Sequence, residues 1–268
     1  YFVFSLLLAF FFKESGIKFS LPLFTLGSIA GVLNFTMMLL LARCLKTGPS
    51  GLTFAFQNTA TMLPSLLLFM LFGRSYGFEM TFTAAIGFVL IGSGLFLSAR
   101  RESQSSGASA LEGKSFSHWA ILVFTIFLIQ GVILTLFQWR TLLLQMPEIP
   151  HPLIPWNFSP EEDIFFLPGF FFLPTLLQLF TFVSSEKRWV SRRESVLGLI
   201  GGLLNGTATF LLLLATKVAT PTQKIVLFPF FAMTVILICS LWGKQLYREK
   251  IYWPGLILCL LGILISSL

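Results

Sequence analysis

The chain has 268 residues, of which 56% are apolar and only 11% are charged, and its mean hydropathy is +0.87. Soluble domains are about 45–50% apolar and about 25% charged, so this composition excludes a soluble enzyme, a coiled coil and a disordered chain. The net charge of +7 comes from basic residues between apolar stretches, where lipid headgroups explain it, and no nucleic-acid partner is predicted. We therefore predict an all-α integral membrane protein.

Nine apolar stretches predict transmembrane helices, because about 20 apolar residues in a helix cross roughly 30 Å of hydrocarbon. In chain order they lie at about 1–12, 22–42, 51–72, 81–99, 119–139, 164–184, 196–216, 224–242 and 251–268. The first stretch, YFVFSLLLAFFF, is about half a span long, so we expect it to be a truncated helix. The expected location is a multi-pass position in the cell membrane.

The sequence contains an internal repeat. Residues 26–46, LGSIAGVLNFTMMLLLARCLK, align without a gap on residues 197–217, LGLIGGLLNGTATFLLLLATK, and 10 of the 21 positions are identical. The shared order of glycine, glycine, asparagine and threonine does not follow from hydrophobicity alone. A proline follows each copy, and a later helix in each half carries Gly92 or Gly262. Three consecutive predicted helices therefore recur.

The repeat predicts how the chain is organised. Counting back from the second copy gives a repeat of five helices, whereas the first half shows four, so we expect ten spans in the intact protein. Because five is odd, the second repeat enters the membrane in the opposite orientation, as in the inverted repeats of secondary transporters. The predicted boundaries are 1–99 for the first repeat, 100–117 for a Ser/Gly-rich linker and 118–268 for the second repeat.

With two such repeats, the chain resembles the EamA-like ten-helix branch of the drug/metabolite transporter superfamily. The best-matched segment is GLIGGLLNGTATFLLLLATKVATPTQKIVLFPFF, followed by a turn at Gly243 and by WPGLILCLLGILI. The resemblance implies a secondary transporter, not an enzyme, that moves a small polar or amphipathic metabolite by alternating access. A proton-coupled multidrug efflux carrier is the alternative within this class. An interfacial lipid-modifying enzyme and a non-transporting scaffold are the alternatives outside it.

The repeated asparagine and threonine residues are the first candidates for a substrate cavity. An unpaired amide in hydrocarbon costs several kcal/mol, so an asparagine in the middle of a span must face protein or water. Asn34 and Asn205, with Thr36 and Thr207 nearby, are therefore predicted to line a central cavity. Hydrogen bonding between helices, worth about 0.6 kcal/mol on average in a membrane, is the competing interpretation.

Two further sets of residues are candidates for transport. Gln57 and Asn58 belong to a polar run in the stretch 51–72 and are predicted as additional cavity residues, with helix packing as the alternative. Pro168 and Pro174 interrupt the stretch 164–184 and predict a kink that a gate could use, with a static kink as the alternative.

The repeated glycines are predicted to mediate helix packing. Gly27 and Gly31 are four residues apart, as are Gly198 and Gly202, so each pair lies on one helix face. The absence of side chains on that face lets another helix backbone approach closely.

No cofactor and no metal is predicted. The three cysteines, Cys44, Cys239 and Cys259, are isolated and lack CxxC or histidine partners at metal spacing. The expected partners are a small-molecule substrate and the lipid bilayer. A coupling ion stays open, because no Asp or Glu lies near the middle of any predicted span. The substrate and the oligomeric state are likewise left open.

The proline-rich segment 147–163 is predicted to lie outside the bilayer. Its acidic end is explained by a helix start in which Ser159 is the N-cap and acidic residues follow in the first turn. The enzyme alternative would use four groups of this chain as interfacial acids and bases: His118, His151, Glu161 and Asp163. No HExxH or GxSxG motif supports that alternative.

The orientation in the membrane is open between two predictions. Alternating the loops places 12 of the 18 basic residues on the side of the 100–117 linker, which the positive-inside rule assigns to the cytoplasm. The resemblance implies cytoplasmic termini and an external linker. A single cysteine at Ser106, in a chain otherwise free of cysteine, tests both. Labelling by an impermeant reagent from the cytoplasmic side is expected from the charge count, and labelling from outside is expected from the resemblance.

Overall fold

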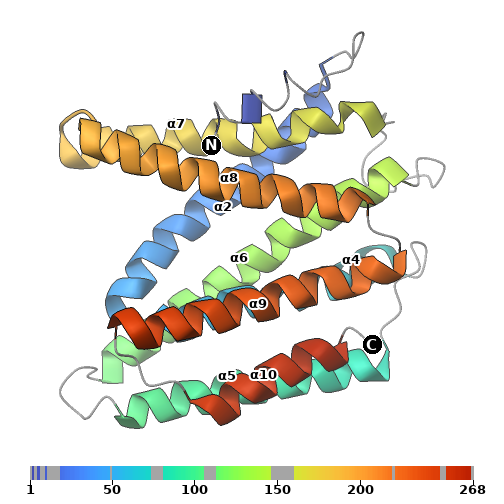
Figure 1. Cartoon of the computed structure of the whole chain (residues 1–268), viewed down its shortest axis with the longest axis vertical. Coiled ribbons are helices and arrows are strands. Elements are labelled where there is room, and N and C mark those ends of the chain that lie inside the picture. The colour runs from blue at the N-terminus through green and yellow to red at the C-terminus, as the bar shows by residue number, and fades with distance from the viewer. Residues whose placement is uncertain are drawn as a thin grey trace. The chain divides into compact units, whose positions relative to one another are not determined.

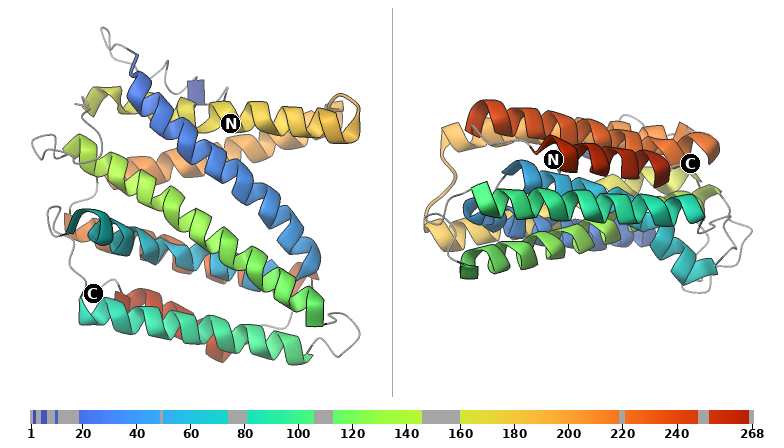
Figure 2. Two further views of the ribbon diagram at one scale, coloured as in Figure 1. Left: turned by 180° about the vertical axis from the view of Figure 1, so that it is seen from behind. Right: turned by 90° about the horizontal axis from the view of Figure 1, so that it is seen from below.

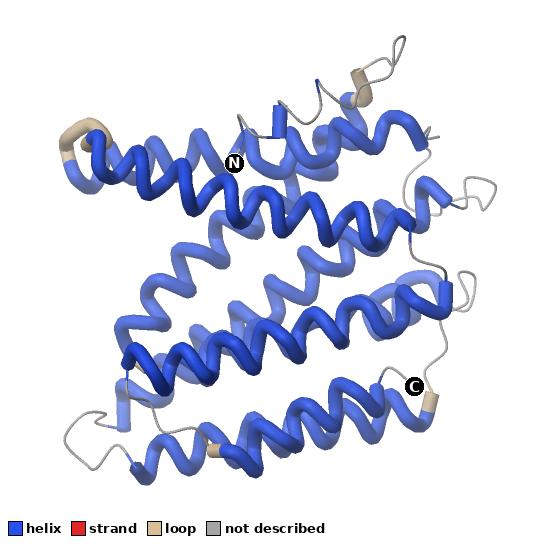
Figure 3. Tube along the Cα trace, in the orientation of Figure 1, coloured by secondary structure: helices blue, strands red, loops and turns tan. Residues whose placement is uncertain are grey.

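The structure is a computed structural model that describes residues 2, 5, 6, 10, 19–48, 50–73, 81–105, 113–145, 160–218, 221–247 and 252–266. Most of these residues are helical, and none of them is in a strand (Figures 1 and 3). The all-helical prediction is therefore confirmed for the described residues. The predicted helix at 1–12 falls largely on residues outside this set.

The helices follow the predicted apolar stretches in chain order. They are α2 (Leu21–Thr47), α3 (Ser50–Thr59), η1 (Ala60–Met62), α4 (Leu63–Phe72), α5 (Phe82–Ser105), α6 (Gly113–Gln145), η3 (Pro160–Phe165), α7 (Phe166–Glu186), α8 (Arg192–Val218), α9 (Pro221–Tyr247) and α10 (Trp253–Ser266). Among the described residues, four helical segments are long and apolar enough to cross a membrane: Leu21–Thr47, Ser117–Leu144, Glu162–Glu186 and Arg192–Ala215. Three shorter apolar helices accompany them, at Ala85–Ser98, Phe230–Gln245 and Trp253–Ile265.

Two predicted boundaries differ from the structure. The stretch 51–72, predicted as one helix, is divided into α3, η1 and α4 by a 3₁₀ segment at Ala60–Met62. The predicted linker 100–117 is partly helical, because α5 continues to Ser105 and α6 begins at Gly113. Only residues 106–112 of that linker lie outside the described part of the chain.

The chain forms two compact units, each built from both halves of the sequence. Unit 1 contains Tyr1–Thr36 and Leu136–Val218, and unit 2 contains Met37–Thr135 and Ala219–Leu268. Each unit therefore takes residues from both predicted repeats, and the repeat boundaries remain a prediction.

In unit 2, α5 and α10 lie side by side and approach closely at glycines (Figure 1). A Cβ added at Gly94 would lie 2.6 Å from the carbonyl oxygen of Gly255 and 2.8 Å from the amide nitrogen of Cys259. A Cβ added at Gly262 would lie 2.8 Å from the carbonyl oxygen of Gly87 and 2.8 Å from the amide nitrogen of Ile91. Only glycine allows the two backbones to be this close.

The contacts between α5 and α10 occur in matched pairs. The contact of Gly94 with Gly255 has its counterpart in the contact of Gly262 with Gly87, and positions 87 and 255, like 94 and 262, are 168 residues apart. In contrast, a Cβ at Gly92 would meet nothing within 4 Å. Gly94, and not Gly92, therefore contacts α10. The pairing of Gly92 with Gly262 in the repeat remains a prediction.

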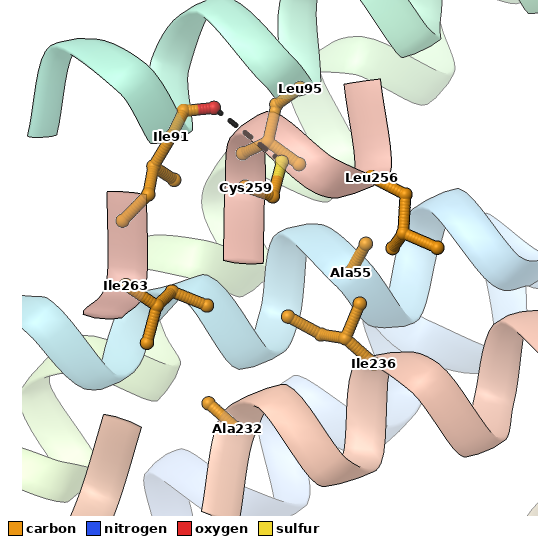
Figure 4. Packing of buried hydrophobic residues seen from close by; sticks show 8 residues of the cluster. All are labelled: Ala55, Ile91, Leu95, Ala232, Ile236, Leu256, Cys259 and Ile263. Atoms are coloured by element: carbon orange, nitrogen blue, oxygen red, sulfur yellow. Dashed lines mark hydrogen bonds between the residues drawn. The ribbon is translucent and has the colours of Figure 1, made fainter. Parts of the chain in front are cut away.

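A second pair of helices in unit 2, α3 and α9, completes its apolar core (Figure 2). Figure 4 shows side chains from α3, α5, α9 and α10 meeting in this core. The buried members are Ala55, Ile91, Leu95, Ala232, Ile236, Leu256, Cys259 and Ile263. Because lipid tails are as apolar as these side chains, their contribution in a bilayer comes from close van der Waals contact rather than from removal of water.

In unit 1, α2 packs against the first turns of α7, again through glycines. A Cβ at Gly27 would lie 2.9 Å from the amide nitrogen of Phe170, and a Cβ at Gly169 would lie 2.9 Å from the carbonyl carbon of Phe24. The hydroxyl of Ser28 donates to the carbonyl oxygen of Gly169 at 3.2 Å. Small residues on both helices thus allow a contact between backbones.

The turn between α7 and α8 is determined by local hydrogen bonds. Lys187 takes the left-handed conformation (φ 52°), and its amide donates to the carbonyl oxygen of Val183 at 2.9 Å, which ends α7. The amide of Ser191 donates to the Glu194 carboxylate at 2.8 Å, and the amide of Glu194 donates to the Ser191 hydroxyl at 3.3 Å. This reciprocal pair is a capping box that starts α8.

The glycine contacts predict different effects of two neighbouring substitutions on α5. Gly94→Ala is expected to destabilise the protein by about 1–3 kcal/mol, because the nearest atoms belong to the backbone of α10 and cannot move aside easily. Gly92→Ala, where the new Cβ has free space, is expected to be neutral or to stabilise by up to about 1 kcal/mol through helix propensity. Melting temperatures in detergent measure both variants, and equal values for the two would contradict this packing.

Candidate functional site

The candidate site is the break between α3 and α4 in unit 2. In an α-helix the amide of residue 64 would donate to the carbonyl oxygen of Ala60, but Pro64 has no amide hydrogen. The amide of Leu63 donates to Ala60 instead, which produces the 3₁₀ geometry of η1. A single proline thus explains why the predicted helix is divided.

Polar side chains surround this break and bond to nearby backbone carbonyls. The Asn58 amide donates to Phe54 at 2.8 Å, the Thr59 hydroxyl donates to Phe56 at 2.8 Å, and the Thr61 hydroxyl donates to the Asn58 carbonyl at 3.0 Å. Thr59 and Thr61 are buried. These bonds satisfy the polar side chains within the chain, by donation to carbonyls three or four residues earlier.

Gln57 is the least satisfied side chain of this polar run. Its Nε2 donates weakly to the sulfur of Met37 at 3.6 Å. Its Oε1 is buried and has no hydrogen-bond partner among the described residues. A buried amide oxygen without a donor is unfavourable, and it is available to accept a hydrogen bond or to coordinate a cation.

One turn before Gln57, a buried hydrogen-bonded group connects α3 with two other helices. The indole nitrogen of Trp119 on α6 donates to the hydroxyl of Thr53 at 3.1 Å. The sulfur of Cys44 on α2 lies 3.7 Å from the same hydroxyl. Thr53, Cys44 and Trp119 are almost completely buried. In contrast to Gln57, Thr53 is therefore held by specific partners.

The break lies within the stretch 51–72, which the sequence predicts to span the membrane. In transporters, broken helices and their freed polar groups bind solutes or coupling ions. Here the break brings together an amide oxygen without a partner, two buried threonines and an asparagine. These groups accept and donate hydrogen bonds, which suits a small polar solute better than an apolar one.

The structure places the four cavity candidates of the repeated motif in unit 1. Asn34 is half-buried on α2, whereas Asn205 is exposed on α8, and no hydrogen bond joins the two side chains among the described residues. Thr36 is exposed and donates to the carbonyl oxygen of Val32 at 3.0 Å. Thr207 is also exposed. Their role in a cavity remains a prediction.

The repeated glycines have different surroundings in the two copies. The backbone of α7 lies directly against Gly27 and Gly31 on α2. On α8, a Cβ at Gly198 would meet nothing within 4 Å, although Gly202 is buried. The glycines of the first copy are therefore packed against another helix, whereas Gly198 of the second copy has open space beside it.

The two prolines of α7 also differ. Pro168 lies in the first turn of α7, where its missing amide hydrogen removes no bond within the helix. Pro174 lies inside the helix and removes the bond to the carbonyl of Phe170. A Cβ at Gly31 would lie 2.9 Å from Pro174 Cγ, so α2 packs at the position of this interruption. Only Pro174 has the placement that a kink requires.

Sequence reasoning missed two interactions. The buried pair Thr53 and Trp119 was not singled out, although Thr53 lies four residues before Gln57 on the same helix face. Arg140 was counted only among the charges of the loops, and Asp163 was explained by a helix start, yet their side chains form a buried ion pair. The predicted N-cap Ser159 lies outside the described residues.

No family model, curated protein or solved structure matches this chain.

The contrast between Gln57 and Thr53 predicts opposite effects on stability. Gln57→Leu removes a buried oxygen that has no partner, so the free energy of unfolding is expected to stay unchanged or rise by about 1 kcal/mol. Thr53→Val leaves the Trp119 indole without its acceptor and is expected to destabilise by about 1–3 kcal/mol. Thermal unfolding in detergent measures both. A larger loss for Gln57→Leu would show that Gln57 has a structural role instead.

Proposed function

We propose that the chain is a secondary transporter that moves a small polar or amphipathic metabolite across a membrane by alternating access between two inverted repeats. The solute and the lipid bilayer are its partners, and no cofactor takes part. This is the function implied by the resemblance to the EamA-like branch of the drug/metabolite transporters.

The observation that carries the proposal is the matched packing of α5 and α10. These helices occupy equivalent places in the two predicted repeats, and their contacts pair Gly94 with Gly255 and Gly262 with Gly87. A twofold relation between repeats of opposite orientation requires equivalent helices to pack antiparallel with exchanged contacts. This pattern supports an inverted repeat, which secondary transporters use to open a central site to either side.

The broken helix around Gln57 gives further support. Changes to 3₁₀ bonding within a membrane helix are tolerated where neighbouring groups satisfy the freed backbone, and they frequently mark functional positions. The break also carries an amide oxygen with no partner among the described residues. A polar solute or a coupling ion would satisfy that group, whereas a purely structural scaffold has no need of it.

Counterflow in liposomes tests the proposal. The full-length protein is reconstituted, the liposomes are preloaded with a metabolite mixture, and labelled amino acids, sugars and nucleotides are offered in turn. Accumulation of one class is expected. Asn34→Leu, Asn205→Leu and Gln57→Leu are each expected to reduce its rate about tenfold, since a hydrogen bond worth about 1.4 kcal/mol corresponds to that factor.

The matched control for these variants is Gly92→Ala, which changes a helix surface with free space and should leave counterflow unchanged. If wild-type protein accumulates no solute, with or without an imposed proton gradient, the transporter proposal fails. If solute accumulates but the three amide variants behave like the control, transport stands and the assignment of the cavity residues fails.

A further inference from the structure

Unit 1 contains a buried arginine in an aromatic setting. The guanidinium of Arg140, near the end of α6, donates through Nε and Nη2 to the carboxylate of Asp163 on η3, with both bonds at 2.5 Å. Its central carbon lies 4.8 Å from the centre of the Phe166 ring. The side chain of Arg140 is only 5% exposed. Two of its three nitrogens are thus engaged with the carboxylate.

The third nitrogen of Arg140 has no acceptor in the part of the chain that the structure describes. Nη1 is buried and lacks a hydrogen-bond partner among the described residues. Arginine is always charged, and its five N–H groups demand acceptors when they are removed from water. A buried donor of this strength without an acceptor is rare in folded proteins and calls for an explanation.

Unit 1 contains a second buried side chain with an unpaired donor, Ser20. Ser20 precedes α2 and is 4% exposed, and its hydroxyl has no partner among the described residues. The ring of its neighbour Phe19 packs against Phe165 at 5.2 Å, and Phe165 directly precedes the residue under the Arg140 guanidinium. Both unpaired groups therefore lie beside the junction of η3 and α7.

The electrostatics of this junction favour an anion. Ser20 stands at the N-terminus of α2, a helix of 27 residues, where the dipole and the free amide groups attract negative charge. The charge of Asp163 is already balanced by Arg140. The helix N-terminus and the two unpaired donors are therefore available to attract and bind another negatively charged group. Their chemistry matches the oxygens of a phosphate or a carboxylate, which accept several hydrogen bonds at once.

We propose that Arg140 and Ser20 form a binding site for an oxyanion, a phosphate or carboxylate group carried by a solute or by a lipid headgroup. Because Nη1 and the Ser20 hydroxyl are buried, the site is closed in this structure, and the oxyanion enters when this end of unit 1 opens. The identification of the oxyanion as part of the transported solute rests on the proposed function. The existence of the site does not.

The chain offers a matched control in a second arginine–carboxylate pair. Arg188 donates through two nitrogens to Glu194, at 2.9 and 2.7 Å, and lies over the ring of Phe182 at 5.2 Å. This pair has the same chemistry as Arg140 with Asp163, but the Arg188 side chain is 46% exposed. Its Nε lies 3.7 Å from the Glu186 carboxylate and the side chain is open to solvent, so this pair is not expected to bind an oxyanion.

Thermal unfolding of the full chain in lipid nanodiscs tests the proposal. Two disc compositions are used: neutral phosphatidylcholine alone, and phosphatidylcholine with phosphatidylglycerol. Sodium phosphate is titrated against sodium chloride of equal ionic strength. We expect the melting temperature of the wild type to rise saturably, by about 2 °C or more, with phosphate in neutral discs or with phosphatidylglycerol. The first result identifies a free oxyanion and the second identifies a lipid headgroup.

Four variants locate the effect. The double variant Arg140→Leu with Asp163→Leu removes both charges together, which folded proteins tolerate better than loss of one partner, and should abolish the shift. Arg140→Lys keeps the charge but lacks the guanidinium fork, and Ser20→Ala removes the second donor, so each should weaken binding about tenfold. The control Arg188→Gln with Glu194→Gln should keep the full shift.

Two results would overturn the site: no shift of the wild type under either condition, or the same shift in Arg140→Lys, Ser20→Ala and the wild type. The test separates this site from the proposed function. Phosphate binding that depends on Arg140, in a protein without counterflow, would refute transport and leave the site standing. Counterflow in a protein that shows no such shift would refute the site and leave transport standing.

Discussion

Close approach between helix backbones is the constraint on which the packing within each unit depends. Lipid tails are as apolar as leucine, so helices in a bilayer gain little from burial alone, and dense van der Waals contact decides which faces associate. The glycines at 87 and 94 on α5, and at 255 and 262 on α10, are seven residues apart and return to the same helix face after two turns. Their spacing therefore determines which surfaces meet.

The same medium explains why polar residues gather at the break between α3 and α4. A carbonyl that loses its helical donor in hydrocarbon must find another one, because no water is present. At the break caused by Pro64, the carbonyl oxygen of Ala60 accepts from the amide of Leu63 instead. The side chains of Asn58, Thr59 and Thr61 lie close to the break in sequence and donate to carbonyls of the preceding turn. Gln57 is the exception, and its unsatisfied oxygen distinguishes a group available to a ligand from groups that stabilise the backbone.

Hydropathy was sufficient to predict an all-helical chain with apolar helices, since the length and the continuity of each stretch depend only on local sequence. Pro64 was readable in the sequence as a helix interruption, as Pro168 and Pro174 were, but the apolar residues on both sides of it led to one predicted helix. Two features required tertiary information. Which of Gly92 and Gly94 contacts α10 depends on packing, and the structure places Gly94 in that contact. The pairing of Arg140 with Asp163 joins separate helices and leaves no periodic signal in the sequence.

The two copies of the repeated motif have similar sequences on one helix face, but this face does not pack against a neighbouring helix in the same way in both copies. On α2 the glycine face is covered by α7, whereas Gly198 on α8 has free space beside it. Alternating access, as proposed, requires the two repeats to be in non-equivalent arrangements at any moment, because the site opens to one side at a time. A symmetric contact, such as that of α5 with α10, is then suited to persist through the cycle. Faces that differ between copies, such as those of α2 and α8, are the ones that would exchange partners.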